Sequence, residues 1–229
     1  MKISLSFVLD GNRRWAKEKG KNTLFGHTAG VKKVQEVMQW LNHSQEVDEC
    51  VFWCLSRANL GREIEELKGL FFLLKHYLKR FKKELIDNKT AFLAIGEIYL
   101  LPKDIQKQIA ELEDATRQFM SHRRLGLGLA YDRDYDLIRA THAVIKKYPD
   151  ITDPKEIESH LGECGYAKNM RNPTVLVRTG AKKGNRTSGA FMGRETEIHF
   201  TETLWPDFSL DSLKKLIEGV KKKEHTYGL

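Results

Sequence analysis

The sequence predicts an α/β protein with a mostly parallel central sheet of about six strands surrounded by helices. Two observations support this fold class. Short apolar runs that suit buried strands alternate along the chain with longer segments whose apolar residues recur at helical spacing. In addition, no linker divides the 229 residues, so we expect one domain that spans residues 1–229.

The first apolar run, residues 3–9, predicts a buried strand that stops at Asp10 and Gly11. Gly and Pro breaks and the period of the apolar residues give the remaining boundaries. Further strands are expected at 49–55, 91–95, 125–130, 174–177 and 195–201. Helices are expected at 15–19, 28–41, 62–85, 102–120, 134–147, 154–161 and 210–222.

The composition is that of a folded soluble protein, with 41% hydrophobic and 31% charged residues. No apolar run approaches the roughly 20 residues of a membrane span. The first residues lack the apolar length and the cleavage site of a signal peptide. We therefore expect a cytoplasmic protein.

The formal charge of +8, from 39 Lys and Arg against 31 Asp and Glu, favours anionic partners. These could be polyanions, anionic membrane surfaces or phosphorylated small molecules. Much of the excess is Lys on predicted helices, which is typical of a solvated face. The positive charge is the only feature of the sequence that favours a nucleic-acid partner, so we expect no such partner. Cys50, Cys54 and Cys164 show no CxxC spacing, and we interpret them as reduced core thiols.

Two segments allow two interpretations each. The predicted helix 62–85 carries an unusually bulky apolar face, which suits either core packing or the wall of an apolar ligand tunnel. The three acids Asp132, Asp134 and Asp136 could form a second metal site. The more ordinary interpretation is that Asp134 caps the helix that follows, and we favour it.

Asp10 is the strongest candidate for a functional carboxylate. It stands at the end of a predicted strand and is followed by Asn12, Arg13 and Arg14. In open α/β sheets, ligands bind beyond the carboxyl ends of the strands, and helix starts there favour anions. A carboxylate among arginines can hold Mg²⁺ that bridges to phosphates. The alternative is that Asp10 only caps the helix and the arginines are solvated.

Other predicted strands also end in polar or cationic side chains, and together these residues would suit two diphosphates and a divalent ion shared by the carboxylates. The sequence has no GxxxxGK[ST] loop, no HExxH and no recognisable nucleophile motif. This leaves chemistry in which diphosphate is the leaving group. The strand-end residues are Asp10, Asn12, Arg14, Ser56, Asn59, Arg62, Arg178, Arg186, Ser188 and Glu197.

Five segments, in order and at similar separations, resemble the cis-prenyltransferases, the undecaprenyl-diphosphate-synthase-like family. They are DGNRRWAKEKG, FGHTAG, LSRANLGRE, RTG and TEIHFTETLWPDF. The resemblance covers nearly the whole chain. It implies an α/β fold, a homodimer or heterodimer, Mg²⁺, and condensation of isopentenyl diphosphate with an allylic diphosphate to form a Z double bond.

The resemblance also implies a role for each matching residue. Asp10 falls on the catalytic aspartate and, with Glu197, on the carboxylates that bind Mg²⁺; Ser56 and Asn59 fall on a segment that helps catalysis. Arg178, Arg186 and Ser188 resemble a clamp for isopentenyl diphosphate. The other implied substrate-binding residues are Gly11, Asn12, Arg13, Arg14, Trp15, His27 and Arg62.

The chain also departs from the family pattern. Leu60 replaces a usual Trp, YDRDYD replaces Asn-Tyr-Gly-Gly-Arg, and the clamp loop is longer. These departures suggest a short-chain or atypical product, with a noncatalytic or weakly active partner subunit of a heterodimer as the alternative. An apolar tunnel must accept the product, and we expect helix 62–85 to line it with Trp53 and Phe92. The product would also allow peripheral contact with a membrane.

Overall fold

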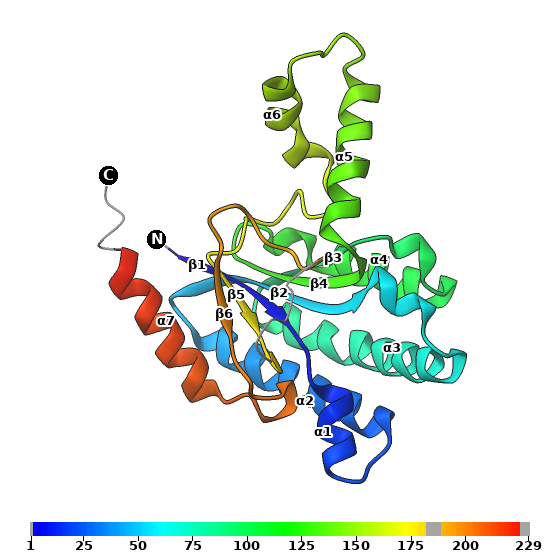
Figure 1. Ribbon diagram of the computed structural model, residues 1–229, viewed down its shortest axis with the longest axis vertical. Helices are drawn as coiled ribbons and strands as arrows, with labels where there is room; N and C mark the ends of the chain where they lie inside the picture. Colours follow the sequence, from blue (N-terminus) through cyan, green and yellow to red (C-terminus); the bar gives the residue numbers. More distant parts are fainter. Residues whose placement is uncertain (1, 182–188, 225–229) are drawn as a thin grey trace.

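The computed structural model describes residues 2–181 and 189–224, and its centre is a parallel six-stranded sheet (Figure 1). The strand order is β3-β4-β2-β1-β5-β6, and every neighbouring pair runs parallel. The predicted fold class is therefore confirmed. The strands are β1 (Ile3–Val8), β2 (Val47–Ser56), β3 (Thr90–Ile95), β4 (Arg123–Tyr131), β5 (Val175–Arg178) and β6 (Glu197–Phe200).

The helices follow the predicted order, and their boundaries differ from the predicted ones by up to five residues, at both ends. α1 begins at Asn12 and α2 at Thr23, because Asn22 accepts a hydrogen bond from the Phe25 amide and so caps α2 earlier than its apolar pattern indicates. The helices are α1 (Asn12–Glu18), α2 (Thr23–His43), α3 (Ile64–Asp87), α4 (Lys103–Thr116), α5 (Arg133–Lys147), α6 (Pro154–Cys164) and α7 (Leu210–Glu224).

The main hydrophobic core lies between one face of the sheet and the helices α2, α3, α4 and α7. Phe7 on β1 stacks on Phe52 of β2 with ring centroids 5.2 Å apart, and both side chains are fully buried. Trp205 closes this core near the end of the chain, and its indole Nε1 donates to the Gly30 carbonyl at 2.8 Å. These contacts hold β1, β2 and α2 together next to the strand ends that carry the predicted site.

The opposite face of the sheet has two smaller hydrophobic clusters, formed with residues near 166–170 and 189–192. Trp53 belongs to both clusters, so its side chain lies on this second face. The expectation that Trp53 lines a tunnel beside α3 is wrong, because successive residues of a strand point to opposite faces. Beyond this face, α5 and α6 form a hairpin that projects from the body of the molecule (Figure 1).

Asp132 caps α5, whereas the sequence indicated Asp134. The Asp132 carboxylate accepts a hydrogen bond from the Tyr135 amide at 3.0 Å, and Asp134 lies in the first helical turn. Asp136 is buried, pairs with Arg139 and accepts from the Tyr166 amide. Burial raises the pKa of the Asp136 carboxyl. These acids therefore stabilise α5 and its junction with the segment after α6.

Within residues 2–181 and 189–224, no helix has the length and apolar character needed to cross a membrane.

Candidate active site

Asp10 follows β1 and is held in place through its backbone. Its carbonyl accepts hydrogen bonds from the Trp205 amide at 3.0 Å and the Thr179 hydroxyl at 2.9 Å. Its carboxylate lies between two guanidinium groups, with Arg14 Nη2 at 3.3 Å from Oδ1 and Arg178 Nη2 at 3.2 Å from Oδ2. The side chain remains 38% exposed, so a ligand can reach it.

The alternative role of Asp10 as a helix cap is wrong. Gly11 occupies the cap position of α1, with a φ of 116° and no side-chain cap hydrogen bond. A side chain at residue 11 would be strained at this φ, and its Cβ would lie 2.9 Å from Leu204 atoms. Gly11 therefore turns the chain so that the Asp10 carboxylate faces the strand ends.

Two glycines of the FGHTAG segment let α1 lie directly against α2. A Cβ on Gly26 would be 2.1 Å from the Asn12 carbonyl oxygen, and a Cβ on Gly30 would be 2.3 Å from Asn12 Oδ1. Trp15 on α1 stacks on Phe25, and its indole donates to Asp207 at 2.8 Å. These contacts account for Trp15 structurally, and its predicted role in substrate binding stays a prediction.

Ser56 and Asn59 meet at the end of β2, where they cap a short 3₁₀ turn (Arg57–Gly61). The Asn59 amide donates to Ser56 Oγ at 3.1 Å, and the Ser56 amide donates to Asn59 Oδ1 at 3.2 Å. Both side chains are thus engaged in local structure. Their predicted catalytic role stays a prediction.

A carboxylate that the sequence did not indicate, Glu66, joins three of the predicted substrate-binding residues. Its Oε1 accepts from Arg62 Nη1 at 2.9 Å, and lies 3.4 Å from His27 Nε2 and 4.0 Å from Arg13 Nε. The spacing of four residues between Arg62 and Glu66 was a signal for at least one of these pairs. Burial lowers the pKa of His27, so its imidazole is neutral near pH 7.

Arg178, at the end of β5, faces Asp10 across the gap between β5 and the residues that follow β1. Its Nε is buried and has no hydrogen-bond partner among the residues that the structure describes. Arg14 donates to the Gly180 carbonyl at 2.6 Å, so the RTG segment and α1 are tied together. Arg186 and Ser188, the other predicted clamp residues, lie outside the described residues.

The chain does not bring Glu197 to Asp10. Glu197 opens β6 and pairs with Val175, which pairs with Leu5 on β1. The rise of about 3.3 Å per residue separates the levels of Leu5 and Val8 by roughly 10 Å, and Asp10 lies further on. Glu197 lies at the start of its strand, whereas Asp10 lies beyond the end of β1, and parallel strands start and end on opposite sides of the sheet. One ion shared by both carboxylates therefore does not fit a single chain. Glu197 as a metal ligand stays a prediction.

Two cavities lie beside the predicted substrate-binding residues Asn12 and His27. A polar cavity of about 380 Å³ is lined by Asp10, by arginines of α1 and by Arg62. An apolar cavity of about 110 Å³ lies between α2, α3 and the sheet, and Phe71, Tyr77 and Phe81 are among the residues that line it. Leu9, Asn12 and His27 line both cavities, so the two spaces are adjacent there.

The bulky face of α3 packs in the main hydrophobic core and also forms a wall of this cavity, so a ligand tunnel along α3 stays a prediction. Phe92, which we also expected there, is fully buried in the main core and is not among the lining residues. Cys54 opens into the apolar cavity, where surrounding protein raises the pKa of its thiol to about 12. Only Cys50 is a buried core thiol, and Cys164 is half-buried.

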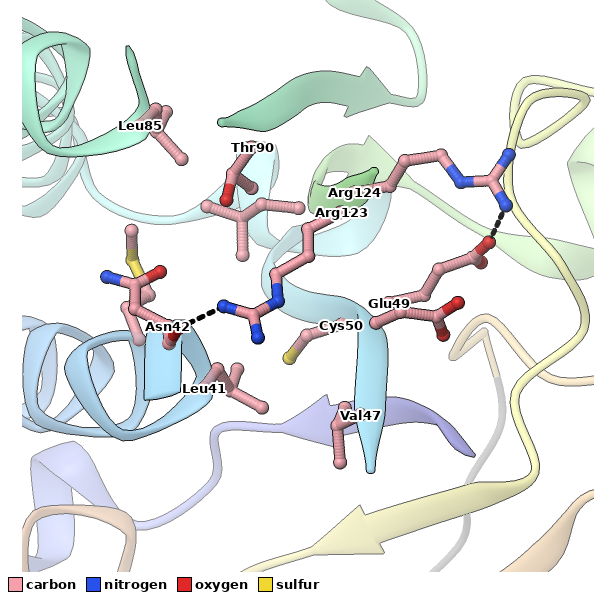
Figure 2. A pocket seen from close by; sticks show the side chains of 12 residues that line it. Leu41, Asn42, Val47, Glu49, Cys50, Leu85, Thr90, Arg123 and Arg124 are labelled. Atoms are coloured by element: carbon pink, nitrogen blue, oxygen red, sulfur yellow. Dashed lines mark hydrogen bonds and ion pairs between the residues drawn. The ribbon is translucent and has the colours of Figure 1, made fainter. Parts of the chain in front are cut away.

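A further, smaller cavity of about 20 Å³ lies at the opposite edge of the sheet, where β2, β3 and β4 begin (Figure 2). Arg123 reaches across it to the Asn42 carbonyl at the end of α2. Beside it, the buried Glu49 pairs with Arg124 and with Arg171. None of the predicted site residues lines this cavity, and its ion pairs hold the strand starts together.

The two adjacent cavities suit an amphipathic ligand with an anionic head. Guanidinium groups at the head end favour phosphate oxygens, and the apolar walls favour a hydrocarbon chain. The head would lie beside Asp10 and the start of the chain beside His27. A reaction at the bond between head and chain is the chemistry that this arrangement supports.

Comparisons with known proteins indicate the same chemistry. Residues 8–228 match the family model Prenyltransf, which describes undecaprenyl diphosphate synthases. An isoprenyl transferase of Helicobacter pylori is 30% identical over 226 residues, which cover 98% of this chain and 95% of that protein. A tritrans,polycis-undecaprenyl-diphosphate synthase (geranylgeranyl-diphosphate specific) of Pyrobaculum aerophilum is 29% identical over 98% of this chain and 94% of its own length.

Among solved structures, the lavandulyl diphosphate synthase of Lavandula x intermedia, in complex with dimethylallyl diphosphate, superposes with a TM-score of 0.84. The two proteins are 25% identical, and the match covers 95% of this chain and 94% of the other. The similarity therefore extends over nearly the whole chain.

Proposed function

Because this chain belongs to the undecaprenyl diphosphate synthase family and is a prenyltransferase, we propose that it condenses isopentenyl diphosphate with an allylic prenyl diphosphate. The product would be a Z-prenyl diphosphate, formed in a Mg²⁺-dependent reaction. The observation that carries this proposal is that the polar and apolar cavities are adjacent and share Asn12 and His27 as lining residues. An allylic diphosphate has a charged head and an apolar chain that match the two spaces.

The residues around the polar cavity would stabilise the departing diphosphate. Arg14 and Arg178 already lie within 3.3 Å of the Asp10 carboxylate, and Arg13 and Arg62 line the same space. As the carbon–oxygen bond breaks, negative charge grows on the diphosphate, and fixed cations in a space poor in water lower the energy of that state. The apolar walls beyond His27 would exclude water from the allylic carbon.

Asp10 is the residue that would hold Mg²⁺. The ion takes oxygen ligands and is commonly bound by one or two carboxylates together with substrate phosphates, so a single carboxylate beside a diphosphate pocket fits it. When bound, Mg²⁺ would neutralise charge on the leaving diphosphate. The two arginines beside Asp10 would turn from the carboxylate to the phosphate oxygens.

A short or atypical product is supported by the small volume of the apolar cavity, about 110 Å³, whose lining includes the bulky side chains of Tyr77 and Phe81. The relative that is named for lavandulyl diphosphate and was crystallised with dimethylallyl diphosphate also supports a five-carbon allylic substrate. We therefore propose that the substrates are isopentenyl diphosphate and a short allylic diphosphate.

We further propose that the protein is a homodimer. On the projecting α5, Leu137, Ile138 and Ile145 are 53%, 68% and 46% exposed. On the edge strand β6, Ile198 and Phe200 are 38% and 47% exposed. Exposed apolar side chains of this size favour burial against another chain.

The test is incubation of the purified protein with labelled isopentenyl diphosphate, Mg²⁺ and a series of allylic primers, followed by mass analysis of the products. We expect Z-prenyl diphosphates from at least one short primer and none after chelation of the metal. Lack of product with every primer would reject catalysis by this chain alone. Activity that appears only on co-expression with a second family member would instead support the partner-subunit alternative.

A further inference from the structure

The predicted substrate-binding residues His27, Arg62 and Arg13 come from three different parts of the chain and converge on one oxygen. Glu66 Oε1 lies 2.9 Å from Arg62 Nη1, 3.4 Å from His27 Nε2 and 4.0 Å from Arg13 Nε. The Glu66 side chain is 15% exposed and the His27 side chain 12%, so both are largely removed from solvent. α1, α2 and the start of α3 are thereby linked through a single carboxylate.

Glu66 contacts Arg13, His27 and Arg62 but does not itself line the polar cavity. Arg13, His27 and Arg62 line that cavity together with Asp10. Glu66 instead lines a neighbouring open cavity, together with the same three residues. It can therefore hold the three side chains from one side while their other side faces a ligand.

A carboxylate in this position has two opposing effects. It orients the Arg62 guanidinium and the His27 imidazole, and it also offsets the positive charge that attracts a diphosphate. The negative charge of Glu66 reduces the attraction for any diphosphate, whether it is part of a substrate or free. It therefore weakens ground-state binding. Orientation matters most when charge moves from carbon to the diphosphate, and misplacement by about 1 Å can cost as much as 10²-fold in rate.

We propose that Glu66 is a positioning residue for prenyl transfer. It holds Arg62 beside the polar cavity and His27 where the polar and apolar cavities adjoin, which is where the bond between the allylic carbon and the diphosphate would lie. This inference rests on the proposed function, because it assigns Glu66 a role in that same reaction.

The test compares Glu66→Gln with Glu65→Gln, which removes the same charge from the preceding residue. The Glu65 side chain is 83% exposed and pairs with Lys68, so it is a matched control. For Glu66→Gln we expect kcat to fall by about 10- to 100-fold. We expect KM for the allylic diphosphate to stay equal or fall, with little change in melting temperature. Glu65→Gln should keep the wild-type kcat.

Two measurements without turnover complete the test. Calorimetric titration with inorganic diphosphate should show equal or tighter binding to Glu66→Gln, because a negative charge has been removed. Nitrogen NMR of the His27 ring should change in Glu66→Gln and not in Glu65→Gln. If Glu66→Gln does not fold, Glu66→Asp keeps the charge but withdraws the oxygens, and the same loss of kcat is expected.

A wild-type kcat in Glu66→Gln would overturn the inference. So would a raised KM together with a large drop in melting temperature, since these would indicate a merely structural residue. An inactive wild type would reject the proposed reaction. In that case the diphosphate titration and the His27 signals still decide whether Glu66 orders the anion-binding groups, and unchanged signals in Glu66→Gln would overturn its role.

Discussion

In Asp10, the backbone makes the contacts that hold the loop, and the carboxylate faces the proposed site. Its backbone carbonyl accepts from Trp205 and Thr179, whereas its carboxylate contacts only Arg14 and Arg178 among the contacts described above. The loop would therefore keep its position if the carboxylate were removed. Replacement of the side chain should then act on the chemistry and leave the fold intact.

We predict that Asp10→Ala lowers turnover by on the order of 10²-fold or more, because it removes an electrostatic element of the transition state. Its melting temperature should stay close to that of the wild type. Asp134→Ala, which removes a 67% exposed carboxylate from the first turn of α5, is the control and should keep full activity. A wild-type rate for Asp10→Ala in steady-state assays would remove Asp10 from the mechanism.

His27 should make stability depend on pH. Burial lowers its pKa from 6.5 in the folded protein; Glu66 opposes this shift, and Arg62 and Arg13 add to it. As the pH falls below 6.5, the unfolded chain binds a proton that the folded chain does not, so folding becomes less favourable down to the folded pKa. His27→Gln cannot bind this proton, and its melting temperature should fall less on acidification. Parallel curves of melting temperature against pH for both proteins would contradict this prediction.

At the scale of elements, the contact between α1 and α2 depends on the absence of side chains at residues 26 and 30. We predict that Gly30→Ala destabilises the protein by about 1–3 kcal/mol, because its Cβ would meet Asn12 Oδ1 at 2.3 Å. Gly219→Ala on α7 is the control, since nothing lies within 4 Å of its added Cβ. It should stabilise the protein by about 0.5–1 kcal/mol in chemical denaturation. Equal effects would show that the helices can separate freely.

The length of the apolar cavity is a property of α3 and its neighbours. Phe81 is the lining residue of this cavity that lies furthest along α3, and Met38, Leu41 and Leu85 on α2 and α3 line the small cavity where β2, β3 and β4 begin (Figure 2). The two spaces follow the same pair of helices, α2 and α3. A smaller residue at position 81 should therefore extend the first space toward the second.

We predict that Phe81→Leu shifts the products toward longer chains, measured by mass analysis after reaction with a short primer. Phe92→Leu is the matched control, because Phe92 is 1% exposed in the same core but lines neither cavity. Both variants lose similar packing and should lose similar stability. An unchanged product length in Phe81→Leu, or the same shift in Phe92→Leu, would show that Phe81 does not limit the chain.

At the scale of the whole molecule, the projecting hairpin and its exposed apolar side chains should mediate dimer formation. We predict that Ile138→Glu yields monomers, because a charge would be buried in the interface. Phe72→Glu on α3 is the control, since both side chains are 68% exposed but only Ile138 lies on α5. Light scattering after size exclusion measures the mass of each. A dimeric Ile138→Glu protein would place the interface elsewhere.

The order of the elements and the polar strand ends could be predicted from the chain itself. Buried strands and amphipathic helices have distinct periods, and Asp10 and Arg178 follow runs that are apolar because the sheet is covered. Helix starts were less accurate, since a cap such as Asn22 or Asp132 depends on which residue adopts extended backbone. The face of the sheet on which Trp53 lies also required strand register.

By itself, the sequence determined the α/β class, the order of strands and helices, and the positions of Asp10 and Arg178 at strand ends, because these depend on local period and composition. Only the tertiary structure decided which of the site residues meet. It separates Glu197 from Asp10, because Glu197 lies at the start of a parallel strand and Asp10 follows the end of another. It also brings Glu66 to His27 and Arg13. Such contacts depend on strand order and helix packing, which join residues far apart in the chain.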